Sequence, residues 1–270
     1  MALFVFQFLF LLLGLGFVFF NVVEPIYVFF YNKPLVVHWH LFPSRISEEQ
    51  RNILSQNFPF YNRLSSSKKR YFEHRINKFR ARYEFIGHEI TITNEIIILI
   101  SGTYVMLTFG MRNYLSDLFK KILIYPTIYY STLNEVYHKG EFNPRMKTIV
   151  FSWEDFLSGH GVASDNINLG LHEFTHVLHF HCLKKRDVNS IIFQDEYAAI
   201  LAIYKTPHLI QAINEKAYLR LYAYENQFEF ISVLLEHFFE TPNDFKNIHP
   251  ELYSHVKRMI NYNENYFVAT

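Results

Sequence analysis

The sequence predicts an α+β domain that is mostly helical, contains a small sheet and follows one N-terminal transmembrane helix. Three observations lead to this class. Residues 2–23 form an uncharged apolar run, several later segments repeat apolar residues at helical spacing, and short strand-like segments lie among them. The chain has 270 residues, enough for one domain of ordinary size behind such a helix. We expect a transmembrane anchor at 1–31, a linker at 32–46 and the domain at 47–270.

The N-terminal run is long enough to cross a bilayer. Its first charge is Glu24, and at about 1.5 Å per residue it spans the ~30 Å hydrocarbon core. A secretory signal peptide, the main alternative, would need a positive n-region and a small-residue cleavage site. Lys33, Arg45 and the later cations all follow the run, so the positive-inside rule places the domain in the cytoplasm. We therefore expect a single-pass protein of the inner (cytoplasmic) membrane, with an aromatic belt at the interface (Tyr27, Phe29, Phe30 and Tyr31).

Charge and cysteine content exclude some classes of protein. The net charge is +1, so the chain lacks a global nucleic-acid signature and we expect no nucleic-acid partner. Cys182 is the only cysteine, so no intrachain disulfide can form, which fits a reducing compartment. A basic run from Lys68 to Arg82 is either a solvated helix face or an attraction for anionic lipid.

Helix and strand signals follow one another along the domain. Ser47-Glu48-Glu49-Gln50 is a capping-box pattern that opens a helix. Further helices are expected at 67–82, 96–109, 187–204 and 226–239, with a short one from Trp153. The segment 96–109 is apolar but too short to span a bilayer, so we interpret it as a buried core helix. Strands are expected at 88–93, 122–125, 136–138 and 148–152, the last two as a hairpin joined through Gly140 and Pro144.

The most informative stretch is His172-Glu173-Phe174-Thr175-His176, which reads His-Glu-x-x-His. On a helix, residues i and i+4 lie on one face, so His172 and His176 can direct ring nitrogens at one metal. Glu173 stands beside them, where its carboxylate can take a proton from the attacking water. Ser164 or Asp165 is the expected N-cap of this helix. The pattern predicts a Zn²⁺ site with a general base.

Several motifs in the same order resemble the zinc peptidases typified by the Mlc titration factor, a glucose-linked family that is also similar to the catalytic domain of lethal factor. The likeness covers roughly residues 44–270 and leaves the anchor outside. It rests on Phe151–Gly159, Leu171–His176, Tyr222-Ala223, Glu229 and Val233–Phe239, together with Glu95 and Ile124–Pro126. The resemblance implies a zincin-like metallopeptidase domain with peptidase or aminopeptidase-type activity on peptides or proteins.

A catalytic zinc takes a third protein ligand and keeps one position open. The resemblance implies Glu229 as that ligand and Tyr222 as the residue that stabilises the oxyanion. From the residues alone, two alternatives remain. Glu236 lies two turns after Glu229 on the same helix face and could instead orient a ligand histidine. Glu196 follows His176 by twenty residues and is otherwise an exposed helix charge.

Two histidines depart from the family pattern. His179 stands where the family commonly has an aspartate, and His181 adds another imidazole nearby. His179 either faces the metal pocket or is an ordinary polar residue near the helix end. The sequence as a whole predicts a membrane-anchored zinc metallopeptidase with Glu173 as general base. The alternative is a regulatory protein that sequesters a transcription regulator or another cytoplasmic partner.

Overall fold

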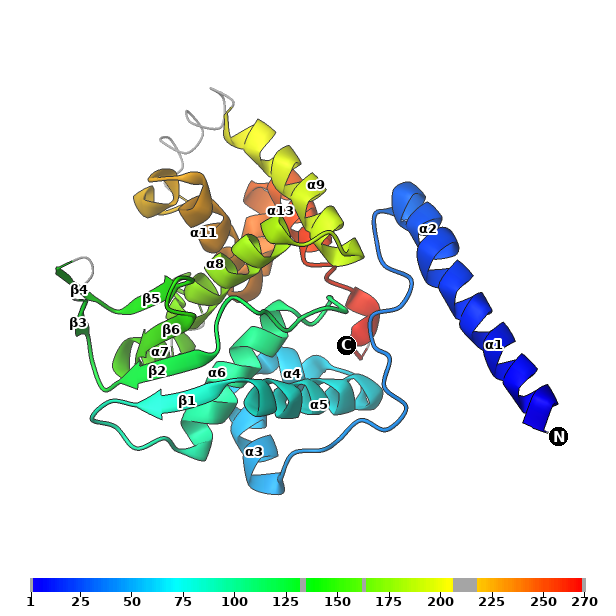
Figure 1. Cartoon of the computed structure of the whole chain (residues 1–270). Coiled ribbons are helices and arrows are strands. Elements are labelled where there is room, and N and C mark those ends of the chain that lie inside the picture. The colour runs from blue at the N-terminus through cyan, green and yellow to red at the C-terminus, as the bar shows by residue number, and fades with distance from the viewer. Residues whose placement is uncertain (1, 132–134, 162–163, 206–217, 269–270) are drawn as a thin grey trace.

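The computed structural model describes residues 2–131, 135–161, 164–205 and 218–268 (Figure 1). The N-terminal helix projects beyond the rest of the chain in this view, and Glu24 joins its C-terminal part to the domain through an ion pair with Arg112. It consists of α1 (Ala2–Val18), a π-helical segment η1 (Phe19–Val23) and α2 (Glu24–Tyr31). From Leu3 to Tyr31 it is long and apolar enough to cross a membrane, and its most apolar window is 0% buried. One N-terminal helix therefore has the properties of a membrane span or of a signal sequence.

A four-stranded sheet lies at the centre of the domain. The strands β1 (Glu84–Gly87), β2 (Lys121–Tyr125) and β6 (Thr148–Ser152) are parallel, and β5 (Gly140–Asn143) runs antiparallel to β6 at the edge. A separate antiparallel pair joins β3 (Tyr129–Ser131) to β4 (Val136–His138). Every residue of β6 is buried, as expected for an inner strand covered on both faces.

The expected strand at 88–93 is wrong, because the strand lies just before it, at Glu84–Gly87. Glu89 adopts a φ of 61°, a left-handed conformation through which a strand cannot continue. Ile90 and Ile92 nevertheless pack against the core. The alternating pattern therefore reflected burial of every second side chain rather than strand pairing.

The expected hairpin between 136–138 and 148–152 is also wrong. β6 pairs with β5, while β4 pairs with β3. The turn between β5 and β6 follows Asn143, whose side chain accepts a hydrogen bond from the Met146 backbone N–H at 3.0 Å. Lys147 closes the turn with a φ of 54°. Gly140 consequently belongs to a strand and not to the turn.

Helices make up most of the domain, as predicted. Ser47 caps α3 (Glu48–Asn57) with the expected capping box, and most of α6 (Asn94–Leu107) is buried, as expected for a core helix. The other described helical segments of the domain are, in chain order, α4 (Pro59–Arg63), α5 (Ser66–Arg82), α7 (Trp153–Gly161), α8 (Leu169–Lys184), α9 (Val188–Tyr204), η2 (Leu221–Tyr224), α11 (Gln227–Glu240), α12 (Pro242–Ile248), α13 (Pro250–Met259) and η3 (Glu264–Tyr266).

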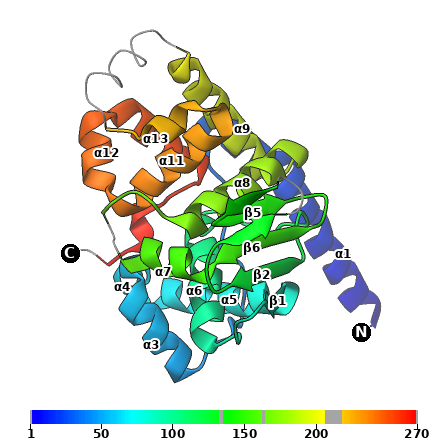
Figure 2. The ribbon, with the colours of Figure 1, turned by 90° about the vertical axis from the view of Figure 1, so that its left-hand side faces the viewer.

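The helix α8 occupies the middle of the fold and packs against α6, α9, α11 and β5. Phe174 fixes one face of it, because its ring contacts an aromatic cluster from α5, α6, the segment before β2, and β6 (Phe79, Tyr104, Phe119 and Phe151). At about 100° per residue, His172 and His176 lie on the opposite face of α8. That face turns toward α11, on the side of the domain away from the N-terminal helix, which stands behind the sheet in Figure 2.

Candidate metal centre

The start of α8 is held by Asn168, whose side-chain oxygen accepts a hydrogen bond from the Leu171 N–H at 3.0 Å. The expected N-cap at Ser164 or Asp165 is therefore wrong. The chain turns at Asn166, where φ is 57°, so a helix cannot begin before that residue. The Asn168 amide also donates to the Glu240 carboxylate at 3.1 Å, which ties the start of α8 to the end of α11.

Three side chains converge between α8 and α11. The Glu229 carboxylate lies 2.9 Å from His172 Nε2 and 3.5 Å from His176 Nε2. The two Nε2 atoms are 3.2 Å apart. Ligand atoms held 2.0–2.2 Å from zinc at tetrahedral angles would be separated by about 3.3–3.6 Å. The spacings of 2.9–3.5 Å, measured to both Glu229 oxygens, are close to this range, so the three side chains could hold one metal ion.

Asn226 positions Glu229 by capping α11. Its side-chain oxygen accepts hydrogen bonds from the Phe228 and Glu229 N–H groups at 2.9 and 3.1 Å. Glu229 thus stands in the first turn of the helix, where the helix dipole also favours a negative charge. Burial opposes ionisation of Glu229, but hydrogen bonds from His172 and His176 hold its pKa well below the usual range. The carboxylate is accordingly available as an anionic ligand.

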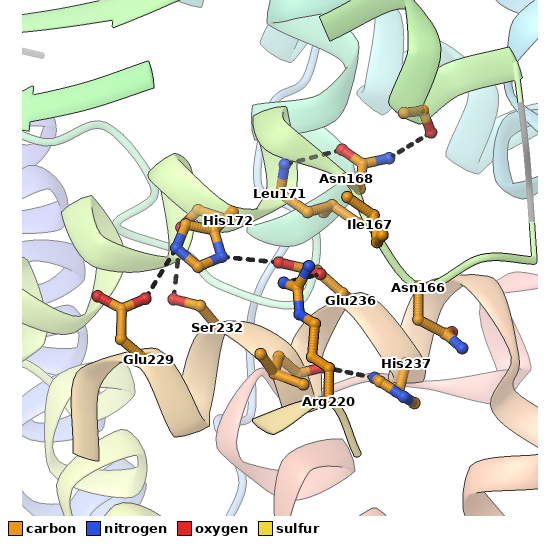
Figure 3. Close-up of polar contacts among 12 residues, drawn as sticks. Asn166, Ile167, Asn168, Leu171, His172, Arg220, Glu229, Ser232, Glu236 and His237 are labelled. Carbon is orange, nitrogen blue, oxygen red and sulfur yellow. Dashed lines mark hydrogen bonds and ion pairs between the residues drawn. The ribbon is translucent and has the colours of Figure 1, made fainter. Parts of the chain in front are cut away.

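Glu236 contacts the other ring nitrogen of His172. Its carboxylate lies 2.7 Å from His172 Nδ1, so Nδ1–H donates and Nε2 is left toward Glu229 (Figure 3). Glu236 is fully buried, and Arg220 donates to its second oxygen at 2.5 Å. Burial alone would lower the pKa of His172, but its hydrogen bonds to Glu229 and Glu236 raise it to about 10. This is the orienting arrangement that metal-bound histidines commonly have.

Glu173 lies on α8 between the two histidines and against the edge strand β5. It is buried, and this burial raises its pKa, although the neighbouring histidines oppose the shift. A Cβ added to Gly140 would come within 3.0 Å of the Glu173 side chain. The same Cβ would come within 2.7 Å of Leu169 Cδ1, so the missing side chain at residue 140 lets the strand approach α8 closely at this point. Sequence reasoning missed this role, since it assigned Gly140 to a turn.

Tyr222 stands in the single 3₁₀ turn η2 that precedes α11. Its ring centroid is 5.7 Å from that of His172, and the side chain is 40% exposed at the edge of the site. Burial and the Glu229 carboxylate raise the pKa of Tyr222, so its hydroxyl remains a proton donor at neutral pH. Arg220 lies over the same ring at 5.6 Å. No local sequence pattern points to Arg220, because its partner Glu236 is distant in sequence.

The remaining predicted residues lie elsewhere. Glu196 is buried rather than exposed and pairs with His255 at 2.7 Å and with Arg258 at 2.8 Å. His179 is fully buried against the rings of Tyr197 and Phe228, and burial lowers its pKa to about 4.

His181 is also buried, and it lines a separate cavity of about 370 Å³ with Arg82 and Lys185. Among the described residues, only His172, His176 and Glu229 form a group that could hold a metal ion.

Comparison with known proteins bears on this arrangement. The chain is 23% identical over 246 residues to an uncharacterized protein of Synechocystis sp. (strain ATCC 27184 / PCC 6803 / Kazusa), covering 84% of this chain and 85% of that protein. The sequence profile of the glucose-regulated metallo-peptidase M90 family matches residues 38–260, which include both α8 and α11. With this match over most of its length, the chain belongs to the glucose-regulated metallopeptidase family M90.

Proposed function

We propose that this protein is a membrane-anchored zinc metallopeptidase that hydrolyses peptide bonds. The observation that carries the proposal is the convergence of His172, His176 and Glu229, whose ligand atoms lie within 4.8 Å of one another, with Glu173 next to them on α8. Two imidazoles and one carboxylate suit zinc, and three protein ligands are typical of catalytic sites. The membership of a metallopeptidase family supports this reading of the geometry.

The chemistry follows from the position of each side chain. When bound, zinc would supply a Lewis acid that polarises the scissile carbonyl and makes water more acidic. Glu173 accepts the proton of the attacking water and returns it to the leaving amine as the C–N bond breaks. Its raised pKa suits both steps, since a general base works best with a pKa near the operating pH. Tyr222 donates its hydroxyl proton to the oxyanion in a hydrogen bond.

The proposal includes the location of the enzyme. The helix from Leu3 to Tyr31 is an apolar span, and the cations of the chain follow it, with Lys33 the first. This asymmetry supports a single-pass protein of the inner membrane with its catalytic domain in the cytoplasm. The substrates would then be cytoplasmic peptides or proteins.

Zinc content and peptide cleavage by the purified full-length protein in detergent test the proposal. We expect one zinc per chain and hydrolysis that a chelator abolishes. Peptides with free and with blocked N-termini should be compared, because an aminopeptidase-type enzyme cleaves only the free ones. Glu173→Gln is the control for adventitious proteases, since the amide keeps the shape but cannot accept a proton. If the zinc-loaded parent and the zinc-loaded Glu173→Gln variant cleave peptides equally, the mechanism is contradicted.

A further inference from the structure

The linker at 32–46 forms neither helix nor strand over its whole described length, yet it is packed against the domain. The backbone oxygen of His40 accepts a hydrogen bond from the Tyr71 hydroxyl at 3.3 Å. Farther along, the Ser44 N–H donates to His74 Nδ1 at 3.0 Å, and Asn77 donates to the Arg45 oxygen at 3.0 Å. The linker is therefore a strap that runs along one face of α5.

The outer side of this strap is apolar. Leu41 and Phe42 are 93% and 91% exposed, and Trp39 is 69% exposed. Single exposed apolar side chains are common on soluble proteins, but a contiguous group more often marks a contact surface. Here three exposed apolar residues lie within four positions, and each is turned away from the domain. They indicate a surface that an apolar partner covers.

The position of the N-terminal helix indicates that this apolar partner is the membrane. The Trp39 ring lies 6.4 Å from the ring of Phe20, measured between centroids. Phe20 belongs to the apolar run and precedes Glu24 by four residues, or about 6 Å along a helix. Trp39 is thus level with the end of the uncharged run 2–23 rather than with Tyr31. Glu24, which is buried and paired with Arg112 of the domain, places the membrane surface near this depth, where tryptophan is enriched. Figure 1 shows the linker descending along the side of the domain that faces this helix.

The charges beside the strap are positive. No Asp or Glu occurs between Glu24 and Glu48. Arg70 and Lys78 are exposed and lie on the same face of α5 as His74, at about 100° per residue. The only carboxylate of α5, Glu73, is buried and paired with Arg51. The exposed surface along the strap therefore combines apolar side chains with uncompensated cations.

We propose that this strap and the adjoining face of α5 bind the surface of an anionic phospholipid bilayer. Trp39, Leu41 and Phe42 enter the headgroup region, and Arg70 and Lys78 face the lipid phosphates. The inference rests on the proposed membrane anchor and adds a second contact that fixes the orientation of the domain. Because α11 and β5 lie on the side away from the N-terminal helix, the metal centre then opens away from the membrane (Figures 1 and 2).

Tryptophan fluorescence in vesicles tests this contact, because the chain has only two tryptophans, Trp39 and Trp153. The full-length Trp153→Phe and Trp39→Phe variants are reconstituted into vesicles of phosphatidylglycerol and phosphatidylcholine, with and without brominated chains. We expect bromine to quench Trp39 at least two-fold and to leave Trp153 unchanged. Phe42→Trp in the background lacking both tryptophans gives a second reporter, farther from the helix, and should also be quenched.

A matched pair of double variants tests the electrostatic part of the proposed membrane contact. Arg70→Gln with Lys78→Gln should reduce the quenching of the residue-42 reporter in phosphatidylglycerol vesicles to its level in phosphatidylcholine alone. Lys69→Gln with Arg80→Gln, on another face of the same helix, should leave it unchanged. If the protein resists alkaline extraction from the vesicles but residues 39 and 42 remain unquenched, the strap proposal is overturned and the anchor stands. Release of the protein by alkali would refute the anchor itself.

Discussion

Replacing Glu236 with glutamine tests how the site holds His172. Glu236 accepts from His172 Nδ1 at 2.7 Å and from Arg220 at 2.5 Å, and it is fully buried. Glutamine has nearly the same volume but offers one acceptor oxygen and one donor NH₂ in place of two acceptors. If its oxygen faces Arg220, its NH₂ faces His172 and favours the tautomer with the proton on Nε2. If the amide is reversed, its NH₂ opposes the guanidinium.

Either orientation weakens the metal site without removing a ligand. Hydrogen bonds to charged groups are worth about 1.5–3 kcal/mol in proteins. At about 1.4 kcal/mol per tenfold change, this corresponds to a loss of roughly 10–100-fold in zinc affinity. Loss of an orienting partner at other zinc sites costs a similar ~10–100-fold. Glu229→Gln removes a proposed ligand and should therefore cost more than Glu236→Gln.

The assay is the zinc dissociation constant, measured by competition with a chromophoric chelator at fixed pH. Glu196→Gln is the matched control, because it also removes a buried carboxylate but lies outside the site. We expect its zinc affinity to equal that of the parent, while its melting temperature falls because Arg258 and His255 lose their partner. An unchanged zinc affinity in Glu236→Gln would refute the orienting role. A greater loss in Glu236→Gln than in Glu229→Gln would reverse the ligand assignment.

Three further predictions concern other parts of the chain. Tyr222→Phe should lower kcat by about 10²–10³-fold and leave KM nearly unchanged; steady-state kinetics within a few-fold of the parent would make Tyr222 a packing residue. Burial raises the pKa of Glu240 to about 7, so ionising it costs stability as the pH rises from about 4.5 through 7. Glu240→Gln should therefore raise the melting temperature at pH 8 and not at pH 4, and equal shifts would exclude this linkage. Fractionation of the tagged protein should recover it in the membrane with its domain sensitive to protease only from the cytoplasmic side; a soluble, processed form would indicate a signal peptide.

Local patterns predicted those features that one helix determines by itself. The spacing of His172 and His176 places them together whatever the tertiary structure. The capping box at Ser47 likewise depends only on neighbouring residues. The strands were less predictable, because the alternation of Ile90 and Ile92 indicates burial without specifying a partner strand. Gly140 shows the same limit, since its proximity to Glu173 arises from tertiary packing.

The choice of the third ligand shows why spacing alone left alternatives. Glu229 and Glu236 share one face of α11, about 10.5 Å apart along its axis, and both contact the same imidazole. Glu229 lies at Nε2 and Glu236 at Nδ1, so His172 is bracketed by the two carboxylates. Contact with His172 alone therefore does not identify the ligand. What distinguishes them is the second histidine: Glu229 also lies 3.5 Å from His176, whereas Glu236 is engaged by Arg220. The position of α11 along α8 decides this, and that position depends on how the two helices pack.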